Sequence, residues 1–170
     1  MAMKGFTMEQ QVPAPPKAVF AVLSDLSQAR DWMPAITSIE PITDGPLAEG
    51  SKWTETRTTS RGPFTSTIEV TEFVPDRTFA LRAENRKAEL TFRFNLQAEG
   101  KGTKVTTQSS GRLKGLMAPF SGKLVKEMQS ADADILERLA AQVGKGATAK
   151  AKTAPKTAKQ AKSGKAKKTA

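Results

Sequence analysis

The sequence predicts an α+β domain in which a curved antiparallel β-sheet wraps around a long C-terminal α-helix. Residues 36–112 show the two-residue alternation of strands, interrupted by short turns that contain Gly and Pro. Residues 115–143 instead carry apolar side chains at every third or fourth position, which is the period of a helix. One strand and two short helices are predicted before the strand-rich segment, and the short helices would close one end of the sheet.

The first strand is predicted over residues 3–12, where apolar and polar side chains alternate. Prolines between positions 13 and 16 end this strand. Because proline is tolerated in the first turn of a helix, a short helix is predicted from about Pro16 to Asp25. A second short helix stops before Pro34, since the residue before a proline avoids helical backbone angles.

About six strands are expected in the region that follows. The clearest lies over residues 88–98, where Phe92 and Phe94 belong to an apolar face and the intervening side chains are polar. One face of this strand is therefore expected to be packed and the other solvated. Short connections, such as the turn at residues 100–102, favour an antiparallel meander.

One long amphipathic helix is predicted over residues 115–143, with Gly144 as its C-terminal stop signal. Pro119 implies an irregular first turn. The apolar stripe of this helix is expected to face the sheet, and its members include Leu116, Phe120, Leu124, Met128, Ile135 and Leu139.

The composition restricts the chemistry. The chain has 170 residues and contains no Cys, no His and no Tyr. Disulfides, thiolate zinc sites, Cys nucleophiles, His bases and Tyr proton donors are therefore excluded. Any catalysis would depend on carboxylates, Lys, Arg, hydroxyls, backbone amides or water. We expect no metal site and no cofactor.

The charge divides the chain into two parts. The net charge is +10, from 27 Lys+Arg against 17 Asp+Glu. Residues 144–170 hold nine of these Lys and no acid, so residues 1–143 keep 18 basic and 17 acidic side chains, or +1. Ala is the only aliphatic side chain in residues 144–170, which cannot bury a core. We therefore predict a folded domain over 1–143 and a disordered Lys/Ala-rich tail over 144–170.

The tail is expected to attract polyanions. Each phosphate contact releases a condensed counterion, so binding to DNA would weaken with salt. The tail has no base-reading element and no aromatic side chain for stacking, which makes any association non-specific. One alternative is an extension that only improves solubility or is merely tolerated. Another is contact with anionic membrane surfaces, although the tail has no apolar side chain that would anchor it there. The lysines concerned are Lys145, Lys150, Lys152, Lys156, Lys159, Lys162, Lys165, Lys167 and Lys168.

No targeting or membrane-spanning segment is evident. The longest apolar run is the six residues Ala18–Leu23, and the N-terminus lacks the apolar stretch of a signal peptide. We expect a soluble cytoplasmic protein, associated with the nucleoid if the tail binds DNA.

The segment APPKAVFAVLSDLSQARDWMP resembles the opening of the polyketide cyclase/dehydrase group, which belongs to the START-related, helix-grip superfamily called SRPBCC. Further matches are the Gly50 turn before the Trp53 strand, the GxGTKVT pattern at Gly100–Thr106, and the long C-terminal helix. The resemblance covers nearly all of residues 3–143. The tail resembles an H1-like histone tail by composition only. The matching residues of the opening segment are Pro15, Phe20, Asp25, Trp32 and Pro34.

The resemblance implies a helix-grip fold with a mostly apolar cavity between sheet and helix, and binding of lipids, sterols, polyketides or other hydrophobic small molecules. Some members of the group are cyclases, but no shared catalytic motif transfers to this chain. Side chains on the expected inward faces would form the cavity wall, or else an ordinary core. The candidate ligand-binding residues are Trp32, Trp53, Phe79, Leu81, Phe92, Phe94, Thr107, Ser109, Met117, Phe120, Leu124 and Met128.

The strand after Gly50 leaves two orientations open. If Trp53 points inward, Glu55 and Arg57 share its side, and they would orient a polar ligand group or act as base and oxyanion partner. In the opposite orientation Thr54, Thr56 and Thr58 point inward, and Glu55 and Arg57 form a solvated pair. A bulge would exchange the two orientations.

Three functions remain open. The first is a module that binds a hydrophobic small molecule, with the tail as a tether to DNA or another polyanion. The second is a cyclase or dehydratase that uses Glu55 and Arg57, although the lack of His and Tyr argues against an enzyme. The third is a nucleoid-associated protein in which the domain is only a scaffold. The oligomeric state does not follow from the sequence.

Overall fold

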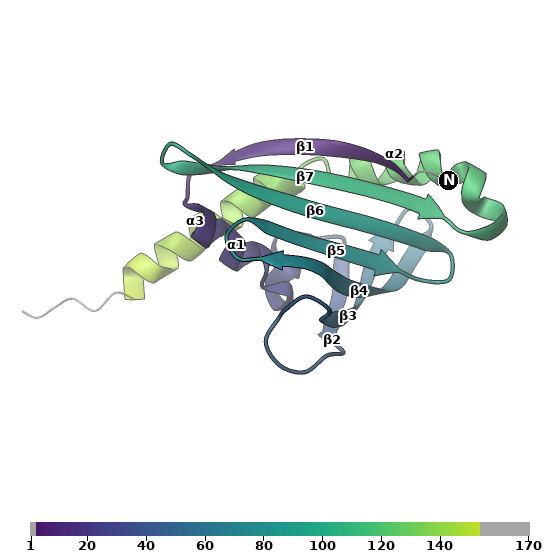
Figure 1. The fold of residues 1–170 in the computed structure, drawn as a ribbon, viewed down its shortest axis with the longest axis horizontal. Coiled ribbons are helices and arrows are strands. Elements are labelled where there is room, and N and C mark those ends of the chain that lie inside the picture. Colours follow the sequence, from purple (N-terminus) through teal and green to yellow (C-terminus); the bar gives the residue numbers. More distant parts are fainter. Residues whose placement is uncertain (1–2, 154–170) are drawn as a thin grey trace, which may run out of the picture.

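The computed structural model describes residues 3–153, which form one seven-stranded antiparallel sheet and several helical segments (Figure 1). This architecture confirms the predicted α+β class with a curved sheet and a long C-terminal helix. The elements are β1 (Lys4–Val12), α1 (Pro16–Leu23), the 3₁₀ helix η1 (Leu26–Asp31), β2 (Ile36–Pro41), β3 (Lys52–Thr59), β4 (Gly62–Val74), β5 (Thr78–Glu84), β6 (Ala88–Glu99), β7 (Gly102–Leu113), the 3₁₀ helix η2 (Gly115–Phe120), α2 (Ser121–Ala131) and α3 (Ile135–Thr153).

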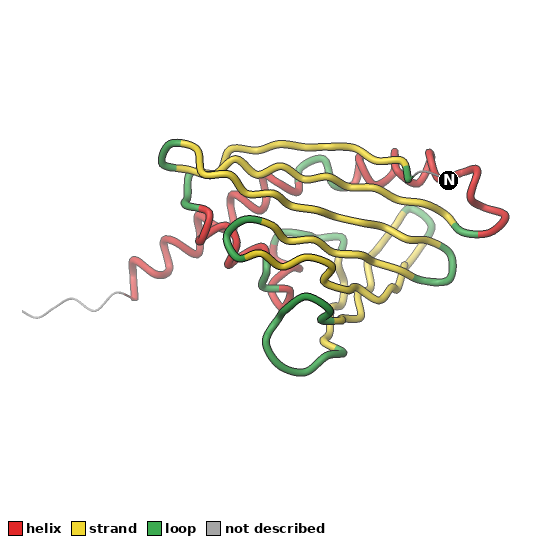
Figure 2. The backbone as a smooth tube through the Cα atoms, in the orientation of Figure 1, coloured by secondary structure: helices red, strands yellow, loops and turns green. Residues whose placement is uncertain are grey.

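The sheet is a meander to which the first strand is added at one edge. The strand order is β1-β7-β6-β5-β4-β3-β2, so each strand from β2 to β7 pairs with its neighbour in sequence. β1 pairs with β7 over its whole length, from Lys4 opposite Gly111 to Val12 opposite Thr103. Register shifts interrupt the β2–β3 and β4–β5 pairs, and such bulges bend and twist a sheet. Figure 2 shows the strands as one curved layer with the helical segments behind it.

The core lies between the sheet and the helices. Phe20 of α1 meets Phe73 and Phe79 edge to face, with ring centroids 5.3 and 6.3 Å apart. Inside this core the Thr103 hydroxyl donates a 2.7 Å hydrogen bond to the carbonyl of Ala14. This bond ties β7 to the proline-rich segment that leads into α1, and it fixes the position of the short helices against the sheet.

The C-terminal helical region differs from the single helix that the spacing predicts. It consists of η2, α2 and α3, with a break at residues 132–134. Gly144 does not end α3, which continues to Thr153. Ala and Lys predominate after Gly144, and their high helix propensity opposes the cost of the two glycines Gly144 and Gly146, which is about 1 kcal/mol each. α3 therefore runs ten residues past the predicted domain boundary at residue 143, and residues 154–170 of the predicted tail lie outside the described part of the chain.

The orientation predicted for the first turns of this region is also wrong. Leu116, Met117 and Phe120 are 97%, 47% and 55% exposed and do not face the sheet. They belong to η2, where three residues complete a turn instead of 3.6, so the apolar spacing no longer follows the buried side of α2. In α2 the prediction holds, because Met128 is buried and Leu124 is half-buried against the core.

Candidate functional site

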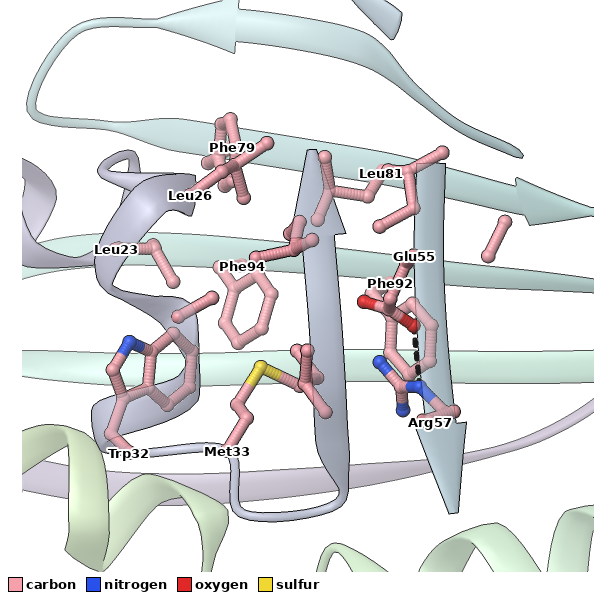
Figure 3. A pocket seen from close by; sticks show the side chains of 15 residues that line it. Leu23, Leu26, Trp32, Met33, Glu55, Arg57, Phe79, Leu81, Phe92 and Phe94 are labelled. Atoms are coloured by element: carbon pink, nitrogen blue, oxygen red, sulfur yellow. Dashed lines mark hydrogen bonds and ion pairs between the residues drawn. The ribbon is translucent and has the colours of Figure 1, made fainter. Parts of the chain in front are cut away.

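The side chains of 15 residues enclose a cavity between the concave face of the sheet and the segment that connects α1 to β2 (Figure 3). Thirteen of the 15 are apolar, and the cavity has a volume of about 20 Å³. A cavity of this size holds about one water molecule, so the side chains almost fill it. The lining residues are Leu23, Leu26, Ala29, Trp32, Met33, Ile36, Ile39, Glu55, Arg57, Ile68, Phe79, Leu81, Ala83, Phe92 and Phe94.

The apolar wall follows from the alternation of the strands. Phe79 and Leu81 on β5 pair with Phe94 and Phe92 on β6, so all four side chains point to the same face. Trp32, which follows η1, meets Phe94 edge to face with ring centroids 6.5 Å apart. The sheet thus supplies the floor of the cavity, and the segment after α1 supplies its opposite side.

Trp32 also brings an unused hydrogen-bond donor to this wall. The side chain is buried, and its Nε1 has no hydrogen-bond partner among the described residues. Leaving a buried donor unpaired costs about 1–3 kcal/mol. A ligand oxygen or nitrogen that accepts this hydrogen bond would recover that free energy.

The polar end of the cavity is formed by Glu55 and Arg57. Glu55 is 2% exposed, and its Oε1 accepts a hydrogen bond of 2.5 Å from Nε of Arg57. The Arg57 guanidinium also lies over the ring of Phe92, 5.7 Å from its centroid. The structure therefore has the inward orientation of this strand, while Thr54 and Thr58 are exposed on the other face.

A third charged group, Asp132, acts on this pair electrostatically. It is buried at the break between α2 and α3. Burial opposes the charge of Arg57, but the attraction and hydrogen bond of Glu55, with the attraction of Asp132, raise the pKa of Arg57. Burial also raises the pKa of Asp132; Arg57 partly offsets this effect, and Glu55 adds to it.

The sequence prediction missed Asp132 because it assigned charged side chains of the helix to the solvent face. The available signal was its spacing. Asp132 follows Met128 by four residues, so it falls on the face that the apolar stripe occupies. An acid at such a position is exceptional and marks a buried charge.

The predicted ligand-binding residues divide into three groups. Trp32, Phe79, Leu81, Phe92 and Phe94 line the cavity together with Glu55 and Arg57. A second group packs into the core or against it without lining the cavity: Thr107, Ser109 and Met128 are buried, and Trp53 and Leu124 are half-buried. Met117 and Phe120 are exposed on η2, away from the cavity.

Several lining residues were not predicted. Met33 lies in the connection from η1 to β2, and Ile36 and Ile39 lie on β2 itself, a strand too short for a clear period. Of the predicted tail lysines, Lys145 is exposed on α3, and Lys150 and Lys152 fall within the same helix. The other six, Lys156, Lys159, Lys162, Lys165, Lys167 and Lys168, lie outside the described residues.

A curved antiparallel sheet that closes over helices, with an apolar cavity between them, defines the helix-grip class of proteins. Solved structures share this fold. The Zhui aromatase/cyclase from Streptomyces sp. R1128 has a TM-score of 0.70 at 13% identity, over 86% of this chain and 96% of its own. The TTHA0849 protein from Thermus thermophilus has a TM-score of 0.71 at 18% identity, over 84% and 99%. Ara h 8.0201 has a TM-score of 0.68 at 18% identity, over 85% and 99%.

The family follows from the sequence itself. Residues 3–144 match the family described as polyketide cyclase/dehydrase and lipid transport, and the chain belongs to that family. The resemblance of the opening segment is thereby confirmed. No curated protein sequence matches the chain. Among the described residues, no helix is long and apolar enough to cross a membrane, and no cluster of acidic side chains is arranged to hold a metal ion.

Proposed function

We propose that this protein binds a small hydrophobic molecule, a lipid or a polyketide-like compound, in the cavity between the sheet and the helices. The observation that carries the proposal is the lining: 13 apolar side chains surround the space, and one buried ion pair, Glu55 and Arg57, stands at its polar end. Ligand sites combine these two features, since apolar walls supply affinity and few polar groups fix the orientation. Membership of a family that includes lipid transport proteins supports the same function.

Binding requires the cavity to expand. Its volume of about 20 Å³ is far below the several hundred Å³ of a typical ligand site. Met33, Ile39 and Leu81 line it and are only half-buried, so they have room to move toward solvent. Met is unbranched and adopts many conformations at little cost, which suits a wall that opens around a ligand.

The test uses the full chain, purified under non-denaturing conditions and examined by native mass spectrometry for a retained lipophile. Nile red, a neutral fluorophore, serves as the added probe. We expect a bound mass or a saturable blue shift of Nile red for the natural chain. Leu81→Trp should abolish probe binding by filling the half-open side of the cavity. Thr67→Trp, on the exposed face of β4, should not. An empty protein that fails to bind Nile red contradicts the proposal.

A cyclase or dehydratase activity is the second candidate, and it rests on the inward position of Glu55 and Arg57. Glu55 would accept a proton from the carbon next to a substrate carbonyl, and Arg57 would stabilise the oxyanion that forms. The ion pair argues against this role, because Arg57 already occupies an oxygen of the Glu55 carboxylate. Glu55→Gln separates the two candidates. An enzyme would turn over a polyketide mimic and lose that turnover in the variant, whereas a protein that only binds would show no turnover with either chain.

The tail supports a separate proposal of non-specific association with DNA or another polyanion. Its nine lysines against a domain of about +1 are the observation behind it. Fluorescence anisotropy with a mixed-sequence duplex tests it, by comparing the full chain with one that ends at Thr153. Equal affinities would contradict a role of residues 154–170. If the tail alone binds and the domain retains no small molecule, the domain acts as a scaffold.

A further inference from the structure

The 3₁₀ helix η2 exposes a cluster of apolar side chains outside the cavity. Five large apolar side chains are exposed among the described residues, and three of them, Leu116, Met117 and Phe120, belong to this one helix. Leu116 is 97% exposed, although a leucine in a turn between a strand and a helix normally packs against one of them. Exposed apolar side chains that gather on one short helix in this way indicate an interaction surface.

Basic side chains lie beside the helix that carries this cluster. A surface groove of about 550 Å³ runs beside η2, and its lining includes Lys4 of β1 together with Arg112 and Lys114. Figure 1 shows why these segments meet: the start of β1 and the helical region after β7 lie at the same end of the sheet. The groove therefore presents ammonium and guanidinium groups next to the exposed apolar side chains.

The charge at this end is strongly positive. We count the segments beside η2, which are the first residue of β1, residues 84–89, residues 112–114 and residues 121–124. They carry six basic side chains and two acidic ones, Glu84 and Glu89, which leaves an excess of four positive charges. Arg112 pairs with Glu89, and Lys114 pairs with Glu84. The remaining four basic side chains have no ion-pair partner among the described residues. The six are Lys4, Arg86, Lys87, Arg112, Lys114 and Lys123.

We propose that η2 and its basic border form a docking surface for an anionic lipid bilayer. Leu116, Met117 and Phe120 would enter the boundary between headgroups and acyl chains, and lipid phosphates would occupy the groove beside Lys4 and Lys114. A bilayer surface combines anionic phosphates with hydrocarbon a few ångströms deeper, which is the combination that this end of the domain presents.

Two other occupants fit less well. A second copy of the chain, joined by a two-fold axis, would bring the same basic border against itself, and like charges disfavour that contact. Three side chains also bury far less than the roughly 1,200 Å² or more of a stable interface. A nucleic acid would satisfy the basic groups but offers the aliphatic side chains of Leu116 and Met117 no apolar environment.

The docking surface lies away from the last described residues of α3. α3, which leads to the tail, ends at the opposite end of the sheet from η2 (Figure 1). Substitutions at η2 therefore leave the tail unchanged, and its contribution to vesicle binding remains constant across the variants.

The test is sedimentation of the full chain with vesicles of phosphatidylcholine, alone or with one quarter phosphatidylglycerol. We expect binding to the anionic vesicles only. The double variant Leu116→Ser/Phe120→Ser should weaken the partition coefficient at least tenfold, because burying either side chain contributes more than that factor. Ile42→Ser is the matched control: Ile42 is 54% exposed and directly follows β2, where its backbone N–H donates a hydrogen bond to the carbonyl of Lys52 at the start of β3, so its replacement should have no effect.

The basic border has its own variants. Lys4→Gln and Lys123→Gln should each weaken the partition about fivefold, which corresponds to about 1 kcal/mol per basic residue near an anionic surface. Lys101→Gln, in the exposed turn between β6 and β7 at the far end of the sheet, is the control. If all three variants lose vesicle binding equally, the lysines act through the overall charge of the protein whatever their position, and the proposal is overturned.

Insertion is measured directly with Leu116→Trp. The new indole should shift to shorter wavelength on anionic vesicles and be quenched by lipids brominated in the acyl chain. If the protein sediments with the vesicles but its fluorescence spectrum does not change, the tail and not η2 contacts the bilayer, and the proposal is overturned. Concentration-dependent dimerisation that the double variant abolishes overturns it in favour of a second copy of the chain.

Discussion

Replacing Arg57 by Met would leave the Glu55 carboxylate inside the domain without its partner. Glu55 is 2% exposed, and Arg57 provides both its hydrogen bond and its ion pair. Removing one member of a buried ion pair costs about 3–5 kcal/mol, because a charge remains buried without compensation. Total stabilities of single domains are about 5–15 kcal/mol, so the variant should lose roughly a fifth or more of its stability.

Urea unfolding of the full chain, followed by circular dichroism, measures this loss. The control is Arg93→Met, which breaks the pair of Arg93 with Glu72 on the outer face of the sheet. Both partners there are partly exposed, so we expect less than about 1 kcal/mol. The double variant Glu55→Gln/Arg57→Met should recover most of the loss, because it leaves no buried charge on β3. If Arg57→Met costs no more than Arg93→Met, the reasoning about a buried, uncompensated carboxylate is wrong.

Two further substitutions test other parts of the site. Asp132→Asn should stabilise the domain increasingly as pH rises. Burial raises the pKa of Asp132 in the folded state above its ordinary value of 3.8. The natural chain therefore loses stability as the pH rises from 3.8 through the pKa of the folded state, and the variant does not. A difference of one pKa unit between the folded and unfolded states corresponds to about 1.4 kcal/mol of stability. If the natural chain and the Asp132→Asn variant have equal urea midpoints from about pH 3.5 to pH 8, this prediction is wrong. Gly111→Val should cost about 1–3 kcal/mol, because even a Cβ at this position would lie 3.0 Å from Cδ2 of Leu90 and 3.1 Å from Sδ of Met128, so the larger Val side chain would force these core side chains to repack. An unchanged thermal midpoint would contradict this.

The alternation of strands explains how much of the cavity the sequence could predict. In β5 and β6 the apolar side chains occupy one parity only, so Phe79, Leu81, Phe92 and Phe94 could be assigned to the inner face correctly. In β3 one face carries Thr side chains and the other combines Trp53 with the charged Glu55 and Arg57, so hydrophobicity does not choose between the two faces. The choice depends on pairing with β4, where the buried Ser66 lies opposite Glu55.

The helical region shows a different limit. The spacing rule assumes 3.6 residues per turn, which holds in α2 and fails in η2, where Pro119 and the left-handed backbone of Gly115, with φ of +61°, favour a tighter turn. The side chains of η2 were for this reason assigned to the core. The same rule counts an acid as solvent-facing, so it could not place Asp132 inside. Both errors concern residues whose local geometry or charge departs from the pattern around them, and such residues are often functional.

Glu55 and Arg57, which line the cavity, and Asp132, which interacts with them electrostatically, are difficult to explain by stability alone. Apolar side chains of similar volume at positions 55, 57 and 132 would often stabilise a fold as well or better, since buried charges lose their hydration. The unpaired indole N–H of Trp32 adds a further cost at the same cavity. A ligand with an apolar body and a hydrogen-bonding group would remove that cost, whereas a pure hydrocarbon would not.

Binding of 1-dodecanol and of dodecane, each measured by displacement of Nile red from the full chain, therefore distinguishes a polar-group receptor from an unselective apolar cavity. We expect the alcohol to bind about tenfold more tightly, which corresponds to about 1.4 kcal/mol and lies within the range of one recovered buried hydrogen bond. Trp32→Phe should reduce that preference if the indole donates to the ligand oxygen. A preference that persists in Trp32→Phe and disappears in Glu55→Gln/Arg57→Met would assign the contact to the ion pair. Equal affinities for the two ligands would mean that the buried polar groups serve the fold and not the ligand.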